Sequence, residues 1–128
     1  MAVHIETVRR LALALPGIEE GVCYGTPAFY VRRKMVVRLR DDHETLVVAF
    51  PKVEREALID GRPDVFSVTD HYRNYDNVLL SLLAVDEGLL QEMIEAAWRF
   101  RAAKKTWPLK PSATEYALRL SLLSSEPV

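Results

Sequence analysis

The sequence has little of what disulfide-rich, membrane-spanning or highly charged proteins are built from. Its one cysteine, Cys23, cannot form a disulfide within the chain, which is typical of a reducing compartment and predicts a cytoplasmic protein. Seventeen basic and eighteen acidic side chains leave a net charge of -1, so no bulk field draws the chain to nucleic acid. Apolar runs are shorter than the roughly 18 residues that span a bilayer, and Glu6, Arg9 and Arg10 interrupt the stretch where a signal peptide would be apolar. We therefore expect no membrane association.

Recognisable catalytic and metal-binding motifs are missing as well. His4, His43, His71 and Cys23 are scattered without the spacing of metal ligands, and no glycine-rich phosphate loop is present. Cys23, His71 and Asp70 are residue types that a thiol enzyme uses, but no nucleophile motif surrounds Cys23. We expect no catalytic activity, no metal and no cofactor.

The hydrophobic pattern predicts an α+β domain with two layers. The 128 residues suit one domain, which we place at 1–108, with a helical extension of the same domain at 109–128. Short connections between the strands imply antiparallel neighbours, in a sheet of about six strands packed by helices. The pattern predicts helices over 4–15, 52–60, 86–104 and 112–124, and strands over 21–24, 28–33, 35–40, 45–50, 65–69 and 78–83.

Strand periodicity assigns side chains to the two faces of this sheet. In the strand over 35–40, Met35, Val37 and Leu39 are predicted to face the core, which leaves Val36, Arg38 and Arg40 on the opposite face. In the helix over 52–60, Val53, Ala57 and Leu58 are predicted to be buried.

The predicted elements are arranged around a polar centre at 70–77, between the strands at 65–69 and 78–83. It carries His71, Tyr72, Arg73 and Tyr75 within five residues, and loops on a rigid scaffold are where binding groups tend to lie. A purely structural interpretation stays open, in which the tyrosines pack at the end of the sheet and Asp70 pairs with Arg73.

Five segments in order resemble the MmcQ/YjbR family across roughly residues 11–105. They are Leu15-Pro16-Gly17-Ile18-Glu19-Glu20, Gly25-Thr26-Pro27-Ala28-Phe29, Arg55-Glu56-Ala57-Leu58-Ile59, Asp70-His71-Tyr72-Arg73-Asn74-Tyr75 and Ala97-Trp98-Arg99. The resemblance implies an α+β fold similar to secretion-chaperone-like domains, and a DNA-binding function. It does not extend over 109–128, and it carries over no catalytic residues.

A basic strand face is the candidate surface for DNA. Arg38 and Arg40 share a face by parity, and Arg32 is expected beside them with Tyr30 between. Guanidinium groups contact phosphates and tyrosine stacks on bases, so His71, Tyr72, Arg73 and Tyr75 extend this surface if the loop lies at the same end. The acidic side chains of Asp41, Asp42 and Glu44 follow immediately and would repel a phosphate backbone.

The alternative is a module that binds a small flat aromatic ligand or a protein through the loop at 70–77. Aromatic side chains at one end of an open sheet could stack on such a ligand: Tyr24, Tyr30, Tyr72, Tyr75 and Trp98. DNA binding requires the arginines to share one exposed convex face, whereas a ligand site requires the tyrosines to line a concavity. A monomer is the default expectation.

Overall fold

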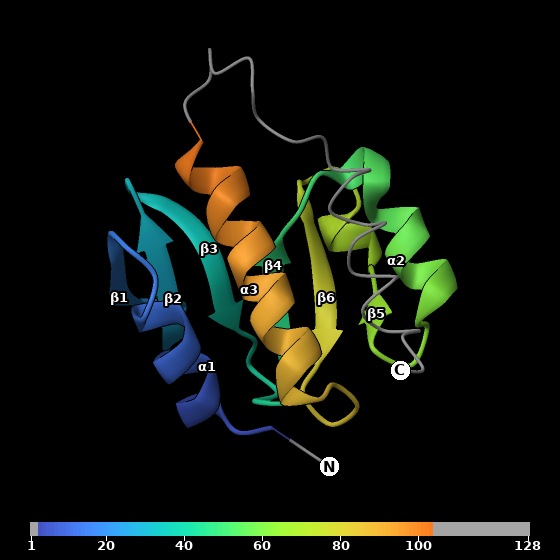
Figure 1. The fold of residues 1–128 in the computed structure, drawn as a ribbon. Coiled ribbons are helices and arrows are strands. Elements are labelled where there is room, and N and C mark those ends of the chain that lie inside the picture. The colour runs from blue at the N-terminus through green and yellow to red at the C-terminus, as the bar shows by residue number, and fades with distance from the viewer. Residues whose placement is uncertain (1–2, 104–128) are drawn as a thin grey trace, which may run out of the picture.

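The protein forms a six-stranded antiparallel sheet with two helices packed across one face (Figure 1). The computed structural model describes residues 3–103. The strands follow the order β1-β2-β3-β4-β6-β5. The elements are α1 (Ile5–Leu13), β1 (Ile18–Cys23), β2 (Thr26–Val31), β3 (Lys34–Leu39), β4 (Thr45–Ala49), the 3-10 turn η1 (Lys52–Glu54), α2 (Arg55–Gly61), β5 (Phe66–Ser67), the 3-10 turn η2 (Asp70–Tyr72), β6 (Asn77–Ser81) and α3 (Glu87–Ala102).

The predicted α+β architecture is confirmed, with differences at the ends of elements. Every pair of neighbouring strands is antiparallel. Strand β1 begins at Ile18, three residues earlier than predicted, and β5 is reduced to two residues. Helix α3 begins where Asp86 caps it, because the Asp86 side chain accepts a hydrogen bond of 2.8 Å from the Leu89 amide. The predicted extension at 109–128 and its helix at 112–124 lie outside the described residues.

The hydrophobic core lies between the sheet and the pair α1 and α3. Apolar side chains at helical spacing line the inner faces of both helices, and alternate residues of β2, β3, β4 and β6 meet them. The principal members are fully buried: Val8, Ala12, Phe29, Val37, Leu46, Val48, Val78, Leu80, Leu90, Met93, Ile94 and Ala97. The main core therefore lies on one side of the sheet, and Ala28, Val47 and Leu79 are buried on the other side, in the same row as Arg38.

A β-bulge in β3 makes part of the predicted assignment of side chains to the two faces of the sheet wrong. Phe29 pairs with Val37 and Tyr30 pairs with Met35, so Val36 is the extra residue between them. Val36 is fully buried in the core, whereas half-buried Met35 lies outside the core cluster, the reverse of the prediction. An extra residue shifts the alternation by one, which periodicity alone cannot detect. Beyond the bulge, Val37 and Leu39 are in the core as predicted.

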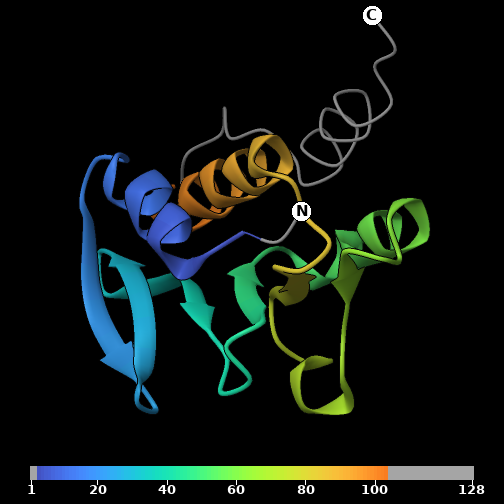
Figure 2. The ribbon, with the colours of Figure 1, turned by 90° about the horizontal axis from the view of Figure 1, so that it is seen from below.

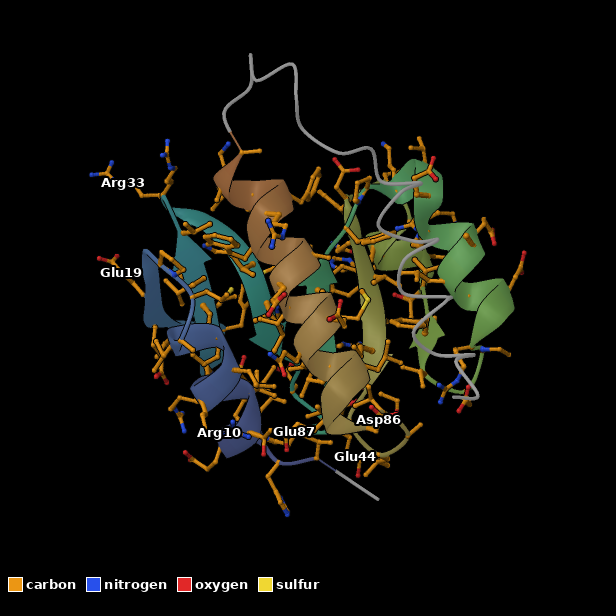
Figure 3. All side chains as sticks on the ribbon, viewed as in Figure 1. Arg10, Glu19, Arg33, Glu44, Asp86 and Glu87 are labelled. Carbon is orange, nitrogen blue, oxygen red and sulfur yellow. The ribbon has the colours of Figure 1, made fainter. Side chains whose placement is uncertain are left out.

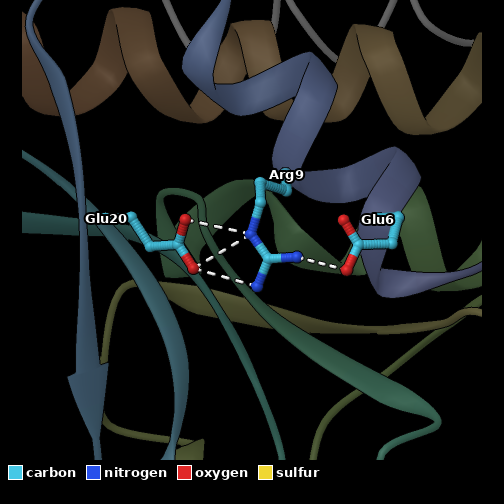
Figure 4. Close-up of polar contacts among 3 residues, drawn as sticks. All are labelled: Glu6, Arg9 and Glu20. Atoms are coloured by element: carbon cyan, nitrogen blue, oxygen red, sulfur yellow. Dashed lines mark hydrogen bonds and ion pairs between the residues drawn. The ribbon is translucent and has the colours of Figure 1, made fainter.

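Ion pairs attach α1 to its neighbours. The Arg9 guanidinium lies between two carboxylates, with its Nη2 2.9 Å from Glu20 of β1 and its Nη1 2.5 Å from Glu6 (Figure 4). Hydrogen bonds to Glu20, and then to Glu6, raise the pKa of Arg9. Arg10 pairs with Glu87 at the start of α3, 2.6 Å away (Figure 3). Both arginines are thus already neutralised by carboxylates.

In the segment formed by η1 and α2, the predicted burial is confirmed at Leu58 and wrong at Val53 and Ala57. Val53 is 78% exposed and Ala57 is also exposed, whereas Arg55 and Leu58 are buried. The segment begins with the 3-10 turn η1, and the change of period rotates the side chains that follow. The buried side of this segment therefore includes Arg55, which was not among the residues predicted to be buried.

Among residues 3–103, no helix has the length and apolar character needed to cross a membrane.

Candidate functional site

Arg38 is at the centre of the candidate site. Its neighbours in sequence, Val37 and Leu39, belong to the core, so strand alternation directs Arg38 to the face without α1 and α3. Its Nη1 donates to the Thr26 hydroxyl at 3.3 Å and to the Leu39 carbonyl at 3.2 Å, and its Nη2 donates to the Tyr72 hydroxyl at 3.0 Å. The guanidinium also lies 5.5 Å from the centre of the Tyr24 ring, within cation–π range. Arg38 thus links the β1–β2 turn to the loop before β6.

The chain of contacts continues from Tyr72 along that loop. The Arg40 guanidinium lies 5.8 Å from the Tyr72 ring centre. The His71 ring meets the Tyr72 ring edge-on at 4.7 Å and is tilted against the Tyr75 ring at 6.5 Å. We call this connected set the arginine–aromatic strip: Tyr24, Arg38, Arg40, His71, Tyr72 and Tyr75.

The strip is on the side of the sheet opposite α1 and α3. The β1–β2 turn, the β3–β4 turn and the η2 connection all extend from the sheet in that direction (Figure 2). Tyr24 is 85% exposed and Tyr75 is 60% exposed, while Arg38, Arg40 and Tyr72 are half-buried. The strip therefore has open aromatic ends and a more enclosed middle.

Neither arginine of the strip forms an ion pair with a described residue. The structure shows carboxylate pairs for four other arginines over residues 3–103, namely Arg9, Arg10, Arg62 and Arg73. The Arg38 guanidinium contacts two hydroxyls, a carbonyl and an aromatic ring, and the Arg40 guanidinium contacts an aromatic ring. Neither charge is neutralised by an ion pair within the described residues, although the charge of Arg40 acts on the Asp42 carboxylate and lowers its pKa.

Asp42 of the β3–β4 turn is already engaged in that turn. Its carboxylate accepts from the amides of Glu44 at 2.9 Å and Thr45 at 3.0 Å, and from the Thr45 hydroxyl at 2.8 Å. Desolvation raises the pKa of Asp42. These hydrogen bonds and the charge of Arg40 together lower it by more, so the pKa of Asp42 lies below its ordinary value. Asp42 acts as a turn cap, while the exposed side chains of Asp41 and Glu44 set an acidic border beside Arg40.

Arg55 holds the loop that carries half of the strip, and the sequence did not single it out for this role. It is 7% exposed, and its Nη1 donates to the carbonyls of Tyr72 at 3.4 Å, Tyr75 at 3.1 Å and Asn77 at 2.8 Å. Its Nη2 donates to the Arg73 carbonyl at 2.7 Å. One sequence signal exists: a cation at the first position of α2 opposes the helix dipole, which indicates a tertiary role.

Two further basic residues fasten the same loop. The Lys52 amide donates to the Asp76 carboxylate at 2.9 Å, and its side-chain amine donates to the Asn74 carbonyl at 3.2 Å. From α3, Arg101 donates to the Asp76 carbonyl at 3.3 Å and to Met35 of β3 at 3.1 Å. Burial is the largest influence on the pKa of Arg101 and lowers it. The negative charge of Asp76 raises this pKa by a smaller amount. The loop is therefore fixed from η1, α2 and α3.

Arg73 and Arg32 are not joined to the strip by any contact in the structure. Arg73 pairs with Asp70 at 3.1 Å, as the structural interpretation of the loop predicted. Arg32 is in the two-residue β2–β3 turn rather than in a strand, with a φ of 52°. That turn and the β3–β4 turn lie at opposite ends of the sheet, as Arg33 and Glu44 mark in Figure 3. At about 3.3 Å per residue, β3 separates Arg32 from Arg40 by roughly 20 Å.

The aromatic residues of the ligand hypothesis are divided between the two faces of the sheet. Trp98 packs on the helix side, where its indole donates to the Pro16 carbonyl at 2.8 Å. Tyr30 lies on the face of Arg38, and its pKa is raised by burial first and by nearby Cys23 next, while Arg38 lowers it. Tyr24, Tyr72 and Tyr75 are the three tyrosines of the strip. No cluster of three or more potential metal ligands occurs in the part of the chain that the structure describes.

Comparison with known proteins identifies the family. The family model YjbR matches residues 13–100, which is most of the chain. No curated protein sequence matches it. Among solved structures, the chain is similar to protein DR2400 of Deinococcus radiodurans, which has a DUF419 domain. That similarity has a TM-score of 0.68 at 19% identity and covers 88% of this chain and 87% of that one, so it shows the fold alone. The family that the sequence motifs predicted is confirmed: the chain belongs to the YjbR family.

Proposed function

We propose that this protein binds DNA without catalysis, and that Arg38 and Arg40 of the arginine–aromatic strip contact the phosphates. The observation that carries the proposal is the pair of surface guanidinium groups that share one strip of tyrosines and have no ion pair with a described residue. Guanidinium is well suited to phosphate because its planar fork matches two oxygens. We further propose that the protein is cytoplasmic, which its single cysteine supports, and that it is a monomer.

The contacts within the strip support the proposal through pre-organisation. Arg38 is held by three hydrogen-bond acceptors, and Arg40 rests against the Tyr72 ring. A guanidinium that is already positioned loses less side-chain entropy when it binds a phosphate. The carboxylates of Asp41 and Glu44 repel phosphates, so a phosphate backbone is attracted only at the strip itself.

A second candidate is a protein or a small flat aromatic ligand bound at the loop 70–77. It is favoured by Tyr75, which is 60% exposed and whose ring faces only His71 among the described aromatic contacts. Such a ligand would stack on Tyr75 without needing Arg38 or Arg40. Its binding would therefore survive removal of both arginines.

The test is fluorescence anisotropy of labelled oligonucleotides, titrated with the protein at low salt. Arg40→Ala is the cleaner variant, because the Arg40 side chain makes no hydrogen bond to a described residue, while its backbone bonds to Thr45 and His43 do not depend on the side chain. We expect Arg40→Ala to weaken binding about 5- to 20-fold, the effect of one lost charge-assisted contact of about 1–2 kcal/mol. Arg38→Gln, which retains a hydrogen-bonding side chain, is expected to weaken it to a similar extent.

The matched control is Arg32→Ala with Arg33→Ala, which removes two positive charges at the far end of β3. We expect this variant to bind almost as well as the natural sequence. Equal losses in the two sets of variants would assign binding to overall charge rather than to the strip. Absence of binding to any oligonucleotide at low salt would exclude the DNA function, leaving the ligand or protein candidate.

A further inference from the structure

We infer that the arginine–aromatic strip takes single-stranded DNA, with unpaired bases stacked on Tyr24 and Tyr75, rather than the double helix. This inference rests on the proposed DNA-binding function and names its substrate class. It begins with Tyr24, whose position in the β1–β2 turn is unusual for a tyrosine.

Tyr24 occupies a turn position that opposes its side chain. Cys23 pairs with Thr26, so Tyr24 and Gly25 form a two-residue turn, with φ values of 53° and 82°. Positive φ at both positions is the requirement of a type I′ turn, for which Asn-Gly is the preferred pair. A residue with a bulky side chain is disfavoured in this region.

No burial compensates for this strain. Tyr24 is 85% exposed, and its recorded ring contact is the Arg38 guanidinium at 5.5 Å. A strained backbone position that holds an aromatic ring in solvent points to a use of that ring outside the fold. Tyr75, at the other end of the strip, presents a second ring that is 60% exposed.

The arrangement of rings and charges matches an unpaired strand. Base–aromatic stacking combined with a groove of positive charge is how proteins bind single strands without reading their sequence. Here the two open rings lie at either end of a contact chain that contains Arg38 and Arg40. In a double helix the base faces are already stacked on one another, so these rings would have no partner.

The charge of the strip also disfavours the duplex. Double-stranded DNA carries one negative charge per about 1.7 Å of its axis, and its tight binding is driven by many phosphate contacts. The strip offers two arginines without a carboxylate partner in the described chain, and Asp41 and Glu44 border them. Base stacking can supply the affinity that so few charges do not.

The experiment compares three labelled 12-mers by anisotropy at low salt: oligo(dT), the same strand paired with oligo(dA), and an abasic strand with the same phosphates. We expect oligo(dT) to bind at least about tenfold more tightly than the other two, because only its bases are free to stack. Tyr24→Asn is the decisive variant. It removes the ring and places the preferred Asn-Gly pair in the turn, so the protein is expected to fold at least as stably.

Tyr24→Asn and Tyr75→Ala are each expected to weaken oligo(dT) binding about 5- to 100-fold, whereas Tyr24→Phe retains it. Duplex binding equal to or tighter than oligo(dT) binding, or an unchanged affinity in Tyr24→Asn, would overturn the inference while leaving the DNA function standing. If none of the three oligonucleotides binds, the DNA function and the inference fail together.

Discussion

Arg55 shows how a single buried cation can organise a binding loop. Its guanidinium donates to four backbone carbonyls between Tyr72 and Asn77, and within residues 3–103 no ion pair with a carboxylate is shown for it. Carbonyl groups of a loop have no strand or helix to pair with, and burying them unpaired would be unfavourable. Arg55 satisfies them and so fixes the backbone that carries Tyr72 and Tyr75. The side chain that positions the loop is therefore distinct from those that would touch a ligand.

Replacing Arg55 by Met is expected to destabilise the fold by about 2–4 kcal/mol, because one buried and three partly buried hydrogen bonds to loop carbonyls are lost at once. Arg55→Lys is expected to recover only part of this, since one amine cannot replace a fork with two donating nitrogens. Urea unfolding gives the free energies. Hydrogen exchange should become faster at the amides of Tyr75 and Asn77, which lie inside the loop.

A suitable control for Arg55 is Arg62→Met, at the other end of α2. Arg62 pairs with Asp64 at the surface, at 3.1 Å, and surface pairs contribute little. If Arg62→Met were as destabilising as Arg55→Met, the effect of Arg55 could not be ascribed to the loop carbonyls.

At the scale of elements, two tight turns determine where the charged and aromatic side chains lie. Tyr24 of the β1–β2 turn, and Arg32 and Arg33 of the β2–β3 turn, all have positive φ. One turn precedes β2 and the other follows it, so the two turns lie at opposite ends of this six-residue strand. Tyr24 and Arg32 are separated for that reason. The bulge at Val36 adds a change of face within β3 without altering the outward direction of Arg38. Turn chemistry thus decides which cations accompany the tyrosines.

The β2–β3 turn supports a prediction about stability. Changing Arg32 to Asn and Arg33 to Gly is expected to stabilise the protein by about 1 kcal/mol, because Asn-Gly prefers positive φ at both positions. Part of the gain is offset by the larger backbone freedom that glycine gives the unfolded chain. The measurement is the urea midpoint at unchanged m value.

Arg32→Ala with Arg33→Ala separates turn geometry from charge. This pair removes the same charges but retains side chains that disfavour positive φ, so no stabilisation is expected. A decrease in stability on introducing Asn-Gly would contradict the role assigned to the turn.

At the scale of the whole molecule, the two faces of the sheet serve different purposes. Helices α1 and α3 cover one face and enclose the core, while the turns and the η2 connection border the other (Figure 2). The net charge is -1, so DNA would experience attraction only close to the strip, within about one Debye length of 8–10 Å. Binding should therefore depend on few phosphates.

This argument predicts a shallow salt dependence. If Arg38 and Arg40 neutralise two phosphates of a single strand, log K should fall with log salt at a slope of about -1.4. Arg40→Ala should reduce the slope to about -0.7 for the same reason. The slope comes from anisotropy titrations between low and moderate salt. A much steeper slope in the natural protein would mean that other cations take part, with Arg32, Arg33 and Lys34 the first to examine.

Much of the fold was predictable because short-range rules govern it. Alternating apolar residues predicted β2, β3 and β4, Asp86 predicted the start of α3, and short connections predicted antiparallel pairing. The outward direction of Arg38 followed from the same alternation. The predicted position of Arg32 beside Arg38 and Arg40 was wrong, because Arg32 lies in the β2–β3 turn, where strand alternation does not apply. Arg55 was missed because the buried face of a short helix depends on what packs against it.

The sequence by itself determined the two-layer architecture, the near-zero net charge and the family, since periodicity, composition and ordered motifs are properties of the chain. Only the tertiary structure brought Tyr24 of the first hairpin to Arg38, and Arg38 to Tyr72 across 34 residues. It also separated Arg32 and Trp98 from them. The physical reason is that contacts between distant segments depend on register, bulges and turns. A change of one residue in any of these moves neighbouring side chains to the other face of the sheet, as the bulge does for Met35 and Val36.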